Sequence, residues 1–122
     1  MATKAPAKDE AQVPEKKDPL APIASGIDSN GLRWEDHDVF GTTYRVREIT
    51  VPEWDAATDA ADLGNDRINP RLRSRLELAS SIVSPETTIA TMDTWSRAKL
   101  LRLLTIYDRV NTLPAADDEG NA

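Results

Sequence analysis

The stretch LRWEDHDVFGTTYRVREIT shows the alternation of apolar and polar residues that is typical of β-strands. In its second half, Tyr44 and Val46 fall on one face of the strand. Arg45 and Arg47 fall on the other face, which is most simply a face exposed to solvent. The two halves meet at Gly41, where glycine permits the positive φ of a tight turn. The pattern therefore predicts a β-hairpin.

The predicted hairpin runs directly into the start signals of a helix. Thr50 and Glu53 have the spacing of a capping box, in which each side chain binds the other residue's backbone N–H. Pro52 is tolerated here because the N–H groups of the first helical turn have no partner within the helix. Helical spacing continues to about residue 62, and Gly64 ends the helix. Strand and helix are thus joined with essentially no loop, and we assign this structural junction to Gly41, Thr50, Pro52 and Glu53.

A second helix is predicted between two prolines. Asn69 is its expected N-cap and Pro70 its first residue. Pro85 forces Ser84 into an extended conformation and so ends it. In a helical projection its apolar residues form one narrow stripe, made of Leu72, Leu76, Ala79, Ile82 and Val83. We therefore expect this helix to bury one face.

The third predicted helix, WSRAKLLRLLTIYDRVN, follows a connecting segment and has Asp93 or Thr94 as its expected N-cap. Its apolar residues cover about 220° of the helical projection, much more than the ~100° stripe of a helix buried on one side. They are Leu100, Leu101, Leu103, Leu104, Ile106, Tyr107 and Val110. Either this helix is central in the fold and covered on two sides, or one of its sides contacts another chain. The sequence leaves both alternatives open.

Together these elements predict an α+β fold that is mostly helical: an N-terminal β-hairpin followed by about three helices, in one domain of residues 31–113. Residues 1–30 are rich in Ala, Pro, Lys and Asp, so we expect a disordered tail. Residues 114–122 are expected to form a short, disordered acidic tail. A domain of this size buries little more than about 60% of its unfolded surface, so a partner or a homo-oligomer would stabilise it.

Composition removes several kinds of chemistry. The chain has no cysteine and its five glycines are scattered, so we expect no thiolate metal site, cysteine nucleophile or glycine-rich phosphate loop. The single histidine, His37, lies within EDHD, where one imidazole among flexible carboxylates has no defined ligand geometry. We expect a solvated turn or edge strand there. No stretch approaches the ~20 apolar residues of a membrane span. We predict a soluble protein that is not an enzyme and has no cofactor or metal.

Basic residues recur along the second predicted helix, in a chain whose net charge is −6. Arg67, Arg71 and Arg75 lie four residues apart, and Arg73 can pair with Glu77. A basic ridge of this kind could bind nucleic acid. The negative charge of the whole chain instead favours a solvated face with local ion pairs, and argues against nucleic acid as a partner.

Three segments of the chain carry a resemblance to a known family. They are YRVREITVPEWD (Tyr44–Asp55), LRSRLELASSIVSPE (Leu72–Glu86) and the Leu-rich last helix, which ends in YDRVNTL. In this order they resemble the tail assembly chaperones of long-tailed bacteriophages of the siphophage type. In that family a short β element with a Y-x-V-R-E-x-T pattern leads into a helix, a later helix ends in a phrase like S-I-V-x-P, and a Leu-rich helix follows. The resemblance covers about residues 41–113 and does not include the N-terminal extension.

The resemblance implies a non-enzymatic protein that is made in the cytoplasm of the infected host and is absent from the mature virion. Such proteins bind the long, helical tape measure protein and keep it soluble. They also assist the polymerisation of tail tube protein around it. Many are made in an additional, longer form by ribosomal frameshifting, and this form would be a further partner.

If the resemblance holds, the broad apolar side of the third helix is the candidate surface for a client or for a second copy of the chain. The candidate partner-binding residues are Trp95, Leu100, Leu103, Leu104, Ile106 and Tyr107. The alternative is that all six belong to the core. The alternative function is a structural virion protein of the phage tail or the head–tail junction. A third hypothesis is a small regulatory protein that binds nucleic acid through Arg67, Arg71 and Arg75.

Overall fold

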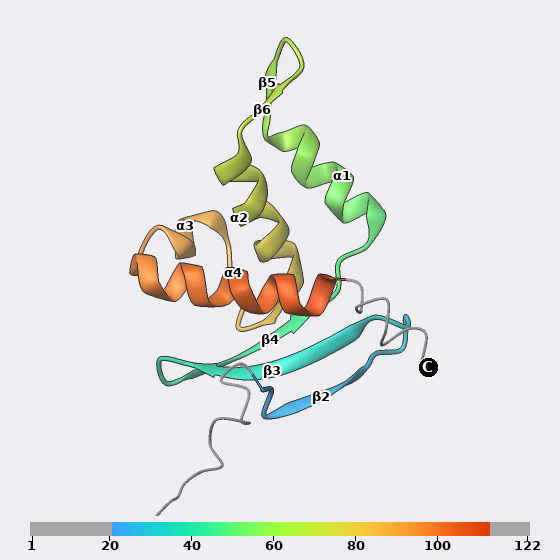
Figure 1. The fold of residues 1–122 in the computed structure, drawn as a ribbon, viewed down its shortest axis with the longest axis vertical. Coiled ribbons are helices and arrows are strands. Elements are labelled where there is room, and N and C mark those ends of the chain that lie inside the picture. The colour runs from blue at the N-terminus through green and yellow to red at the C-terminus, as the bar shows by residue number, and fades with distance from the viewer. Residues whose placement is uncertain (1–20, 113–122) are drawn as a thin grey trace, which may run out of the picture.

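The computed structural model describes residues 21–112, which form an antiparallel β-sheet with helices on one side of it (Figure 1). The strands follow the order β2-β3-β4-β7 in the sheet. Helix α4 (Arg97–Asn111) lies across one face of the sheet and contacts β3 and β4. The strands are β2 (Ala24–Ile27), β3 (Arg33–Val39), β4 (Thr42–Arg47) and β7 (Ile82–Ser84).

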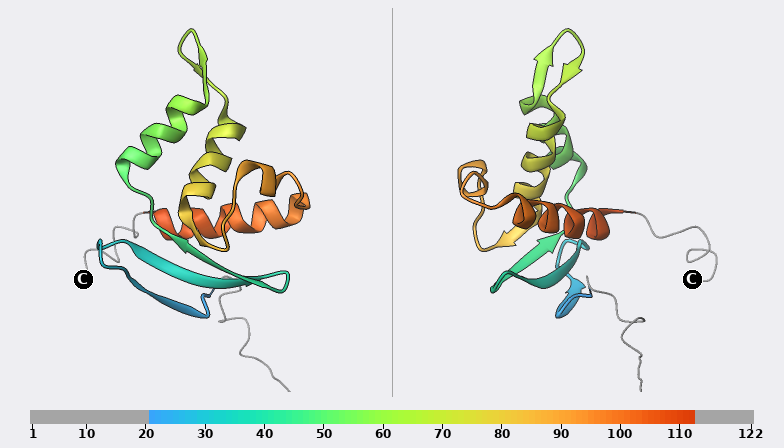
Figure 2. Two further views of the ribbon diagram at one scale, coloured as in Figure 1. Left: turned by 180° about the vertical axis from the view of Figure 1, so that it is seen from behind. Right: turned by 60° about the vertical axis from the view of Figure 1, so that its left-hand side comes forward.

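A pair of helices rises from the same side of the sheet (Figures 1 and 2). They are α1 (Val51–Ala60) and α2 (Pro70–Ser81). A small hairpin of β5 (Asp62–Gly64) and β6 (Arg67–Ile68) joins them at the end that lies far from the main sheet. α2 continues directly into β7, and the short helix α3 (Ile89–Met92) then leads to α4.

The prediction of a mostly helical fold with a single N-terminal hairpin is wrong. Helices hold 45% and strands 27% of the described residues, and the predicted hairpin is the centre of a four-stranded sheet. The sequence does not reveal β2 because its residues, ASGI, include alanine, serine and glycine, which are uncommon in strands. It does not reveal β7 because that strand has three residues and follows α2 without a turn.

The tails predicted from composition lie largely outside the described residues. This holds for residues 1–20 and for the acidic tail of residues 114–122. The part of the predicted N-terminal tail that the structure describes includes β2, which pairs with β3 along its whole length. The domain therefore begins earlier in the chain than residue 31.

The hairpin of β3 and β4 is confirmed, and its turn has two residues. Phe40 and Gly41 have φ angles of 51° and 89°. Positive φ at both turn positions matches the twist of the two strands, and glycine adopts it without strain. A bulky residue such as Phe40 seldom adopts it, and here its side chain is 62% exposed at the tip of the hairpin.

The predicted capping box at the start of α1 is also confirmed, with Pro52 in the first turn. Thr50 Oγ1 accepts a hydrogen bond from the Glu53 N–H, and Glu53 Oε1 accepts one from the Thr50 N–H at 2.9 Å. Arg47, the last residue of β4, donates to both carboxylate oxygens of Glu53, at 2.9 and 2.7 Å. The hydrogen bonds from Arg47, and to a smaller extent the one from Thr50, lower the pKa of Glu53 to about 2 against the opposing effect of burial.

α2 begins as predicted but buries more than one face. Asn69 Oδ1 accepts a hydrogen bond from the Leu72 N–H. Leu78, outside the predicted stripe, is fully buried, whereas Leu72 is only partly buried. The single-stripe prediction is therefore incomplete, because α2 contacts both α1 and α4. At its C-terminal end the buried Ser81 hydroxyl donates to the carbonyl of Arg47 at 2.6 Å and so ties α2 to β4.

The predicted N-cap of the last helix, Asp93 or Thr94, is wrong. α4 starts later, where Ser96 Oγ accepts a hydrogen bond from the Lys99 N–H at 3.1 Å. Thr94 instead closes α3, since its hydroxyl donates to the carbonyl of Thr91 at 2.7 Å. The connecting segment contains a helix of its own, and this shifts the start of α4.

The core lies between the sheet and α4, with α2 and α3 at its border. α4 contributes four of its ten buried residues and is the central helix of the fold. One side of the broad apolar arc is therefore covered by the chain itself. The buried core residues are Val39, Tyr44, Val46, Leu78, Ile82, Met92, Leu103, Ile106, Tyr107 and Val110.

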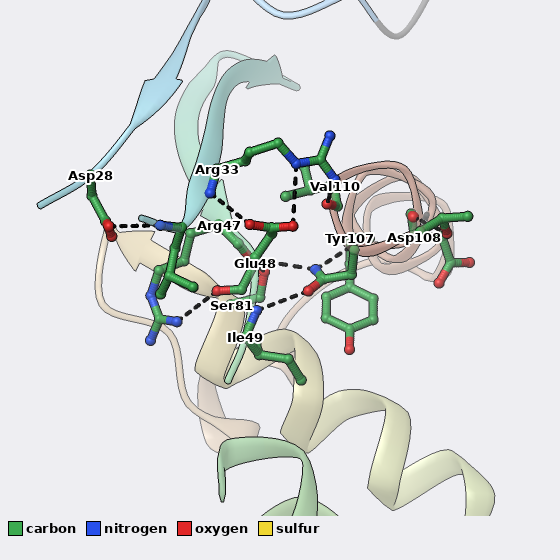
Figure 3. Close-up of polar contacts among 12 residues, drawn as sticks. Asp28, Arg33, Arg47, Glu48, Ile49, Ser81, Tyr107, Asp108 and Val110 are labelled. Atoms are coloured by element: carbon green, nitrogen blue, oxygen red, sulfur yellow. Dashed lines mark hydrogen bonds and ion pairs between the residues drawn. The ribbon is translucent and has the colours of Figure 1, made fainter. Parts of the chain in front are cut away.

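Polar contacts hold the C-terminal end of α4 against the sheet (Figure 3). Asn111 Oδ1 accepts a hydrogen bond from the Ile49 N–H at 2.8 Å. Arg33 Nη2 donates to the carbonyl of Val110 at 2.6 Å, and Arg33 Nε pairs with Glu48 at 3.2 Å. These contacts satisfy the carbonyl of Val110 near the helix end and the N–H of Ile49 after β4, and they fix the direction in which α4 crosses the sheet.

A candidate helix-binding groove between α2 and α4

An open groove of about 560 Å³ lies between the first halves of α2 and α4. Its α4 side is made of leucine side chains only. Its α2 side combines a proline with polar and basic side chains. The residues that line the groove are Pro70, Arg71, Ser74, Arg75, Leu100, Leu101 and Leu104.

Helical spacing places the groove residues side by side. Arg71 and Arg75 lie one turn apart on α2, and Leu100 and Leu104 lie one turn apart on α4. The direction of α4 is fixed by the core contacts of its other side and by the polar contacts at its C-terminal end. Because these contacts hold α4 in place, the leucines on its other side remain at the groove.

The leucine wall of the groove is accessible to a partner. The side chain of Leu101 is 43% exposed, and Leu100 and Leu104 are partly buried. Each leucine-sized side chain that a partner fully buried here would contribute about 1.5–3 kcal/mol to binding, before the costs of association. The groove is thus suited to the apolar face of another segment of protein.

The six predicted partner-binding residues fall into different environments. Leu103, Ile106 and Tyr107 belong to the core, with 0%, 1% and 9% exposure, so they present no surface to a partner in this structure. Leu100 and Leu104 do line the groove. The structure brings only these two together on an accessible surface.

Trp95, the sixth predicted residue, lies before α4 and does not line the groove. Its ring contacts that of Tyr44 edge to face, with 6.0 Å between the centroids, and the ammonium of Lys99 lies 5.0 Å from it. Leu101, the most exposed leucine of α4, is absent from the predicted set. Its position at one edge of the 220° arc does not by itself reveal its exposure, because Ile106 lies at the opposite edge and is 1% exposed.

The two arginines of the groove differ in their contacts. Arg75 Nη1 lies 3.0 Å from Asp93 Oδ1. Arg71 is exposed and makes no ion pair or hydrogen bond with any residue that the structure describes. Among those residues, no carboxylate lines the groove. The groove therefore combines an apolar wall with uncompensated positive charge.

The rest of the predicted basic ridge does not belong to the groove. Arg67 lies on β6, outside α2. The predicted pair of Arg73 and Glu77 is confirmed, with 3.5 Å between Nε and Oε2. Glu77 also accepts a hydrogen bond from the Tyr107 hydroxyl at 2.7 Å, and burial, together with this carboxylate, raises the pKa of Tyr107.

The arginine-bearing face of β4 has partners within the chain. The Arg45 guanidinium lies 3.7 Å from the centroid of the Trp34 ring and donates to both carboxylate oxygens of Asp36, at 2.7 and 3.0 Å. This hydrogen bonding lowers the pKa of Asp36. The prediction of a simply solvated face is therefore incomplete.

The prediction that His37 lies on a solvated turn or edge strand is wrong. His37 is in β3, an interior strand, and is 4% exposed. Its Nε2 lies 2.8 Å from Glu35 Oε1, which also accepts a hydrogen bond from Arg109 Nε at 2.9 Å. Alternation places Glu35 and His37 on the same face of β3 as the buried Val39. This pattern could have indicated that His37 is buried, but the acidic residues on either side of it suggest a solvated segment. Within residues 21–112, no group of three or more His, Cys, Asp or Glu could hold a metal ion.

Comparison with protein-family models, curated proteins and solved structures finds no match to this chain. None of the helices formed by the described residues has the length and apolar character needed to cross a membrane. Function is therefore inferred from the residues of this chain and from the groove.

Proposed function

We propose that this protein is a phage tail assembly chaperone, which binds the tape measure protein and assists the polymerisation of tail tube protein without catalysing a reaction. The observation that carries the proposal is the α2–α4 groove, with its accessible wall of three leucines. An amphipathic helix that lays its apolar face into such a groove is a recurring mode of recognition. A long, helical tape measure protein offers many segments of this kind.

The sequence resemblance supports the proposal by a separate argument, since it rests on short sequence patterns. Its first segment contains the β4–α1 junction, where Thr50 and Glu53 form the capping box and Arg47 binds Glu53. Its last segment is α4, which provides both the core and the leucine wall. In this proposal most of the resembling residues stabilise the fold, and those on the groove side of α4 bind the client.

The protein acts in the host cytoplasm during tail assembly and leaves before the virion is complete. Its partners are the tape measure protein, the tail tube protein and a frameshifted longer form of the chain.

Co-expression with the tape measure protein of the same phage tests the proposal. We expect the tape measure protein to be insoluble alone and soluble beside the wild-type chain. Leu101→Glu should abolish this effect, because a glutamate in the leucine wall removes apolar surface and places a charged carboxylate in the groove. The matched control is Leu63→Glu on β5, where the leucine is 54% exposed and lies outside the groove. A client that stays insoluble beside the wild type would contradict the proposal.

Mass spectrometry of purified phage particles separates this function from its main alternative. A chaperone should be absent from the particles or present only in traces. Stoichiometric presence would instead identify a structural protein of the tail or the head–tail junction.

A further inference from the structure

We propose that the segment that enters the α2–α4 groove is an amphipathic helix in which acidic residues flank the apolar stripe. The identity of this segment as part of the client rests on the proposed function. Its chemical character rests on the groove alone: the wall of Leu100, Leu101 and Leu104 binds the apolar side chains, and Arg71 pairs with a carboxylate of the partner.

The charges of the groove favour an acidic partner. Arg71 has no partner among the described residues, and Arg75 has only Asp93, whose side chain is 63% exposed. An ion pair so open to solvent is weak, and Arg75 can therefore also interact with a carboxylate brought by a partner. Guanidinium groups bind carboxylates through paired hydrogen bonds, which adds orientation to the attraction.

The spacing of the two arginines favours a helix. Arg71 and Arg75 are one turn apart on α2, which corresponds to about 6 Å along the helix axis. Carboxylates three or four residues apart on a partner helix have nearly the same separation. The expected client sequence therefore has Asp or Glu at i and i+3 or i+4, beside leucine-like residues with the same spacing.

The groove contrasts with the rest of the protein surface. The chain has a net charge of −6, and residues 51–66 hold five acidic residues and no basic one. Attraction to the molecule as a whole would therefore select a basic partner. A preference for an acidic peptide would therefore require a local group of positive charges. Among the described residues, Arg71 and Arg75 form such a group in the groove.

The lining of the groove argues against nucleic acid as its occupant. A phosphate could pair with Arg71, but it would leave the three leucines uncovered. Single-stranded nucleic acids are commonly bound by stacking of their bases on aromatic rings, and none of the groove residues is aromatic. An acidic amphipathic helix covers the leucines and the arginines together.

A matched pair of peptides tests the inference with the full chain. Both are fluorescein-labelled, about 18 residues long and share one leucine stripe at helical spacing, with all flanking polar positions Glu in one and Lys in the other. Binding is followed by fluorescence anisotropy as a function of salt. We expect the Glu peptide to bind, and to bind more weakly as salt increases.

Two arginine variants locate the binding. Arg71→Glu should weaken binding of the Glu peptide about fivefold to tenfold and strengthen that of the Lys peptide. Arg102→Glu makes the same change of charge at an exposed position of α4 that does not line the groove, and should change both affinities less than about twofold. Circular dichroism confirms that each variant is folded.

Several outcomes would overturn the inference. They are a Lys peptide that binds the wild type better, equal effects of Arg71→Glu and Arg102→Glu, or Arg71-dependent binding of a labelled oligonucleotide that exceeds binding of the Glu peptide. Self-association of the chain that Arg71→Glu abolishes would assign the groove to a second copy. If the tape measure protein is solubilised without any charge selectivity, the proposed function stands and this inference fails. Charge-selective binding without solubilisation would support this inference and contradict the proposed function.

Discussion

The two apolar sides of α4 have similar residues and different surroundings. Leu103 and Ile106 point towards the sheet and are covered by β3 and β4, whereas Leu101 and Leu104 border an open groove. The difference arises from the facing element, because α2 approaches the groove side with polar and basic residues such as Arg71. An apolar helix face thus indicates that its burial would be favourable. Whether another part of the same chain covers that face depends on the neighbouring helices and strands.

The largest expected effect tests this contrast with one substitution at two positions. Leu103→Ala should lower the free energy of unfolding by about 2–5 kcal/mol, because it leaves a cavity in the core. Leu101→Ala should cost less than about 1 kcal/mol, because that side chain already contacts water. Urea unfolding of both variants measures the difference. Equal losses would mean that both sides of α4 contribute equally to the core.

A smaller effect is expected where polar contacts hold the sheet side of α4 in place. Asn111→Ala should cost about 1–3 kcal/mol, because the Ile49 N–H loses its acceptor in a partly buried place. Thr105→Ala is the control on the solvent side of the helix, where the hydroxyl donates, among the residues that the structure describes, only to the carbonyl of Leu101. It should change stability by less than about 0.5 kcal/mol. If Asn111→Ala is as mild as the control, the apolar contacts alone position α4.

A pH titration tests a different contact, the pair of Arg47 and Glu53 at the β4–α1 junction. The pKa of Glu53 falls from its ordinary 4.5 to about 2 in the folded protein, so the unfolded state binds the proton more readily. Its stabilising effect is therefore complete above pH 4.5 and is lost as the pH falls towards about 2. At neutral pH, Glu53→Gln should cost about 1 kcal/mol, since the pair with Arg47 is partly screened by solvent.

The readout of this titration is the difference in unfolding free energy between wild type and Glu53→Gln. It should shrink as the pH drops from 5 to 2. A difference that stays constant over this range would show that the ionised carboxylate does not stabilise the β4–α1 junction.

The smallest expected effect on stability belongs to the groove. Leu101→Glu should change the free energy of unfolding by no more than about 0.5 kcal/mol, because the carboxylate can reach solvent from a position that is 43% exposed. The same variant should lose binding of the Glu peptide. Urea unfolding and anisotropy, measured on one preparation, separate the two effects. Loss of stability in step with loss of binding would place Leu101 in the core.

Local interactions are the part of the fold that the sequence predicts well. The turn at Gly41, the capping box of Thr50 and Glu53, and the N-cap of α2 at Asn69 all join residues a few positions apart. A pattern of neighbours is sufficient to predict such contacts. The last helix is also predicted, but its expected start is wrong because Asp93 and Thr94 belong to the end of α3, and α4 is capped by Ser96.

The candidate site can be predicted only in part. The breadth of the apolar arc indicates that α4 has more apolar surface than one covered side requires, but it cannot separate Leu103 from Leu104, which are adjacent in sequence. Their burial depends on the sheet and on α2, which approach from different directions. The buried position of His37 escapes prediction for a similar reason, because the face of β3 that carries it is covered by α4, which lies far along the chain.

The hairpin, the abrupt strand-to-helix junction and an excess of apolar surface on the last helix can all be predicted from the residues of this chain. Which part of that surface remains open depends on how the sheet and α2 pack against α4, and the open part faces Arg71 and Arg75. Turns and caps are formed by residues close in the chain, whereas burial and charge pairing depend on segments brought together across the fold.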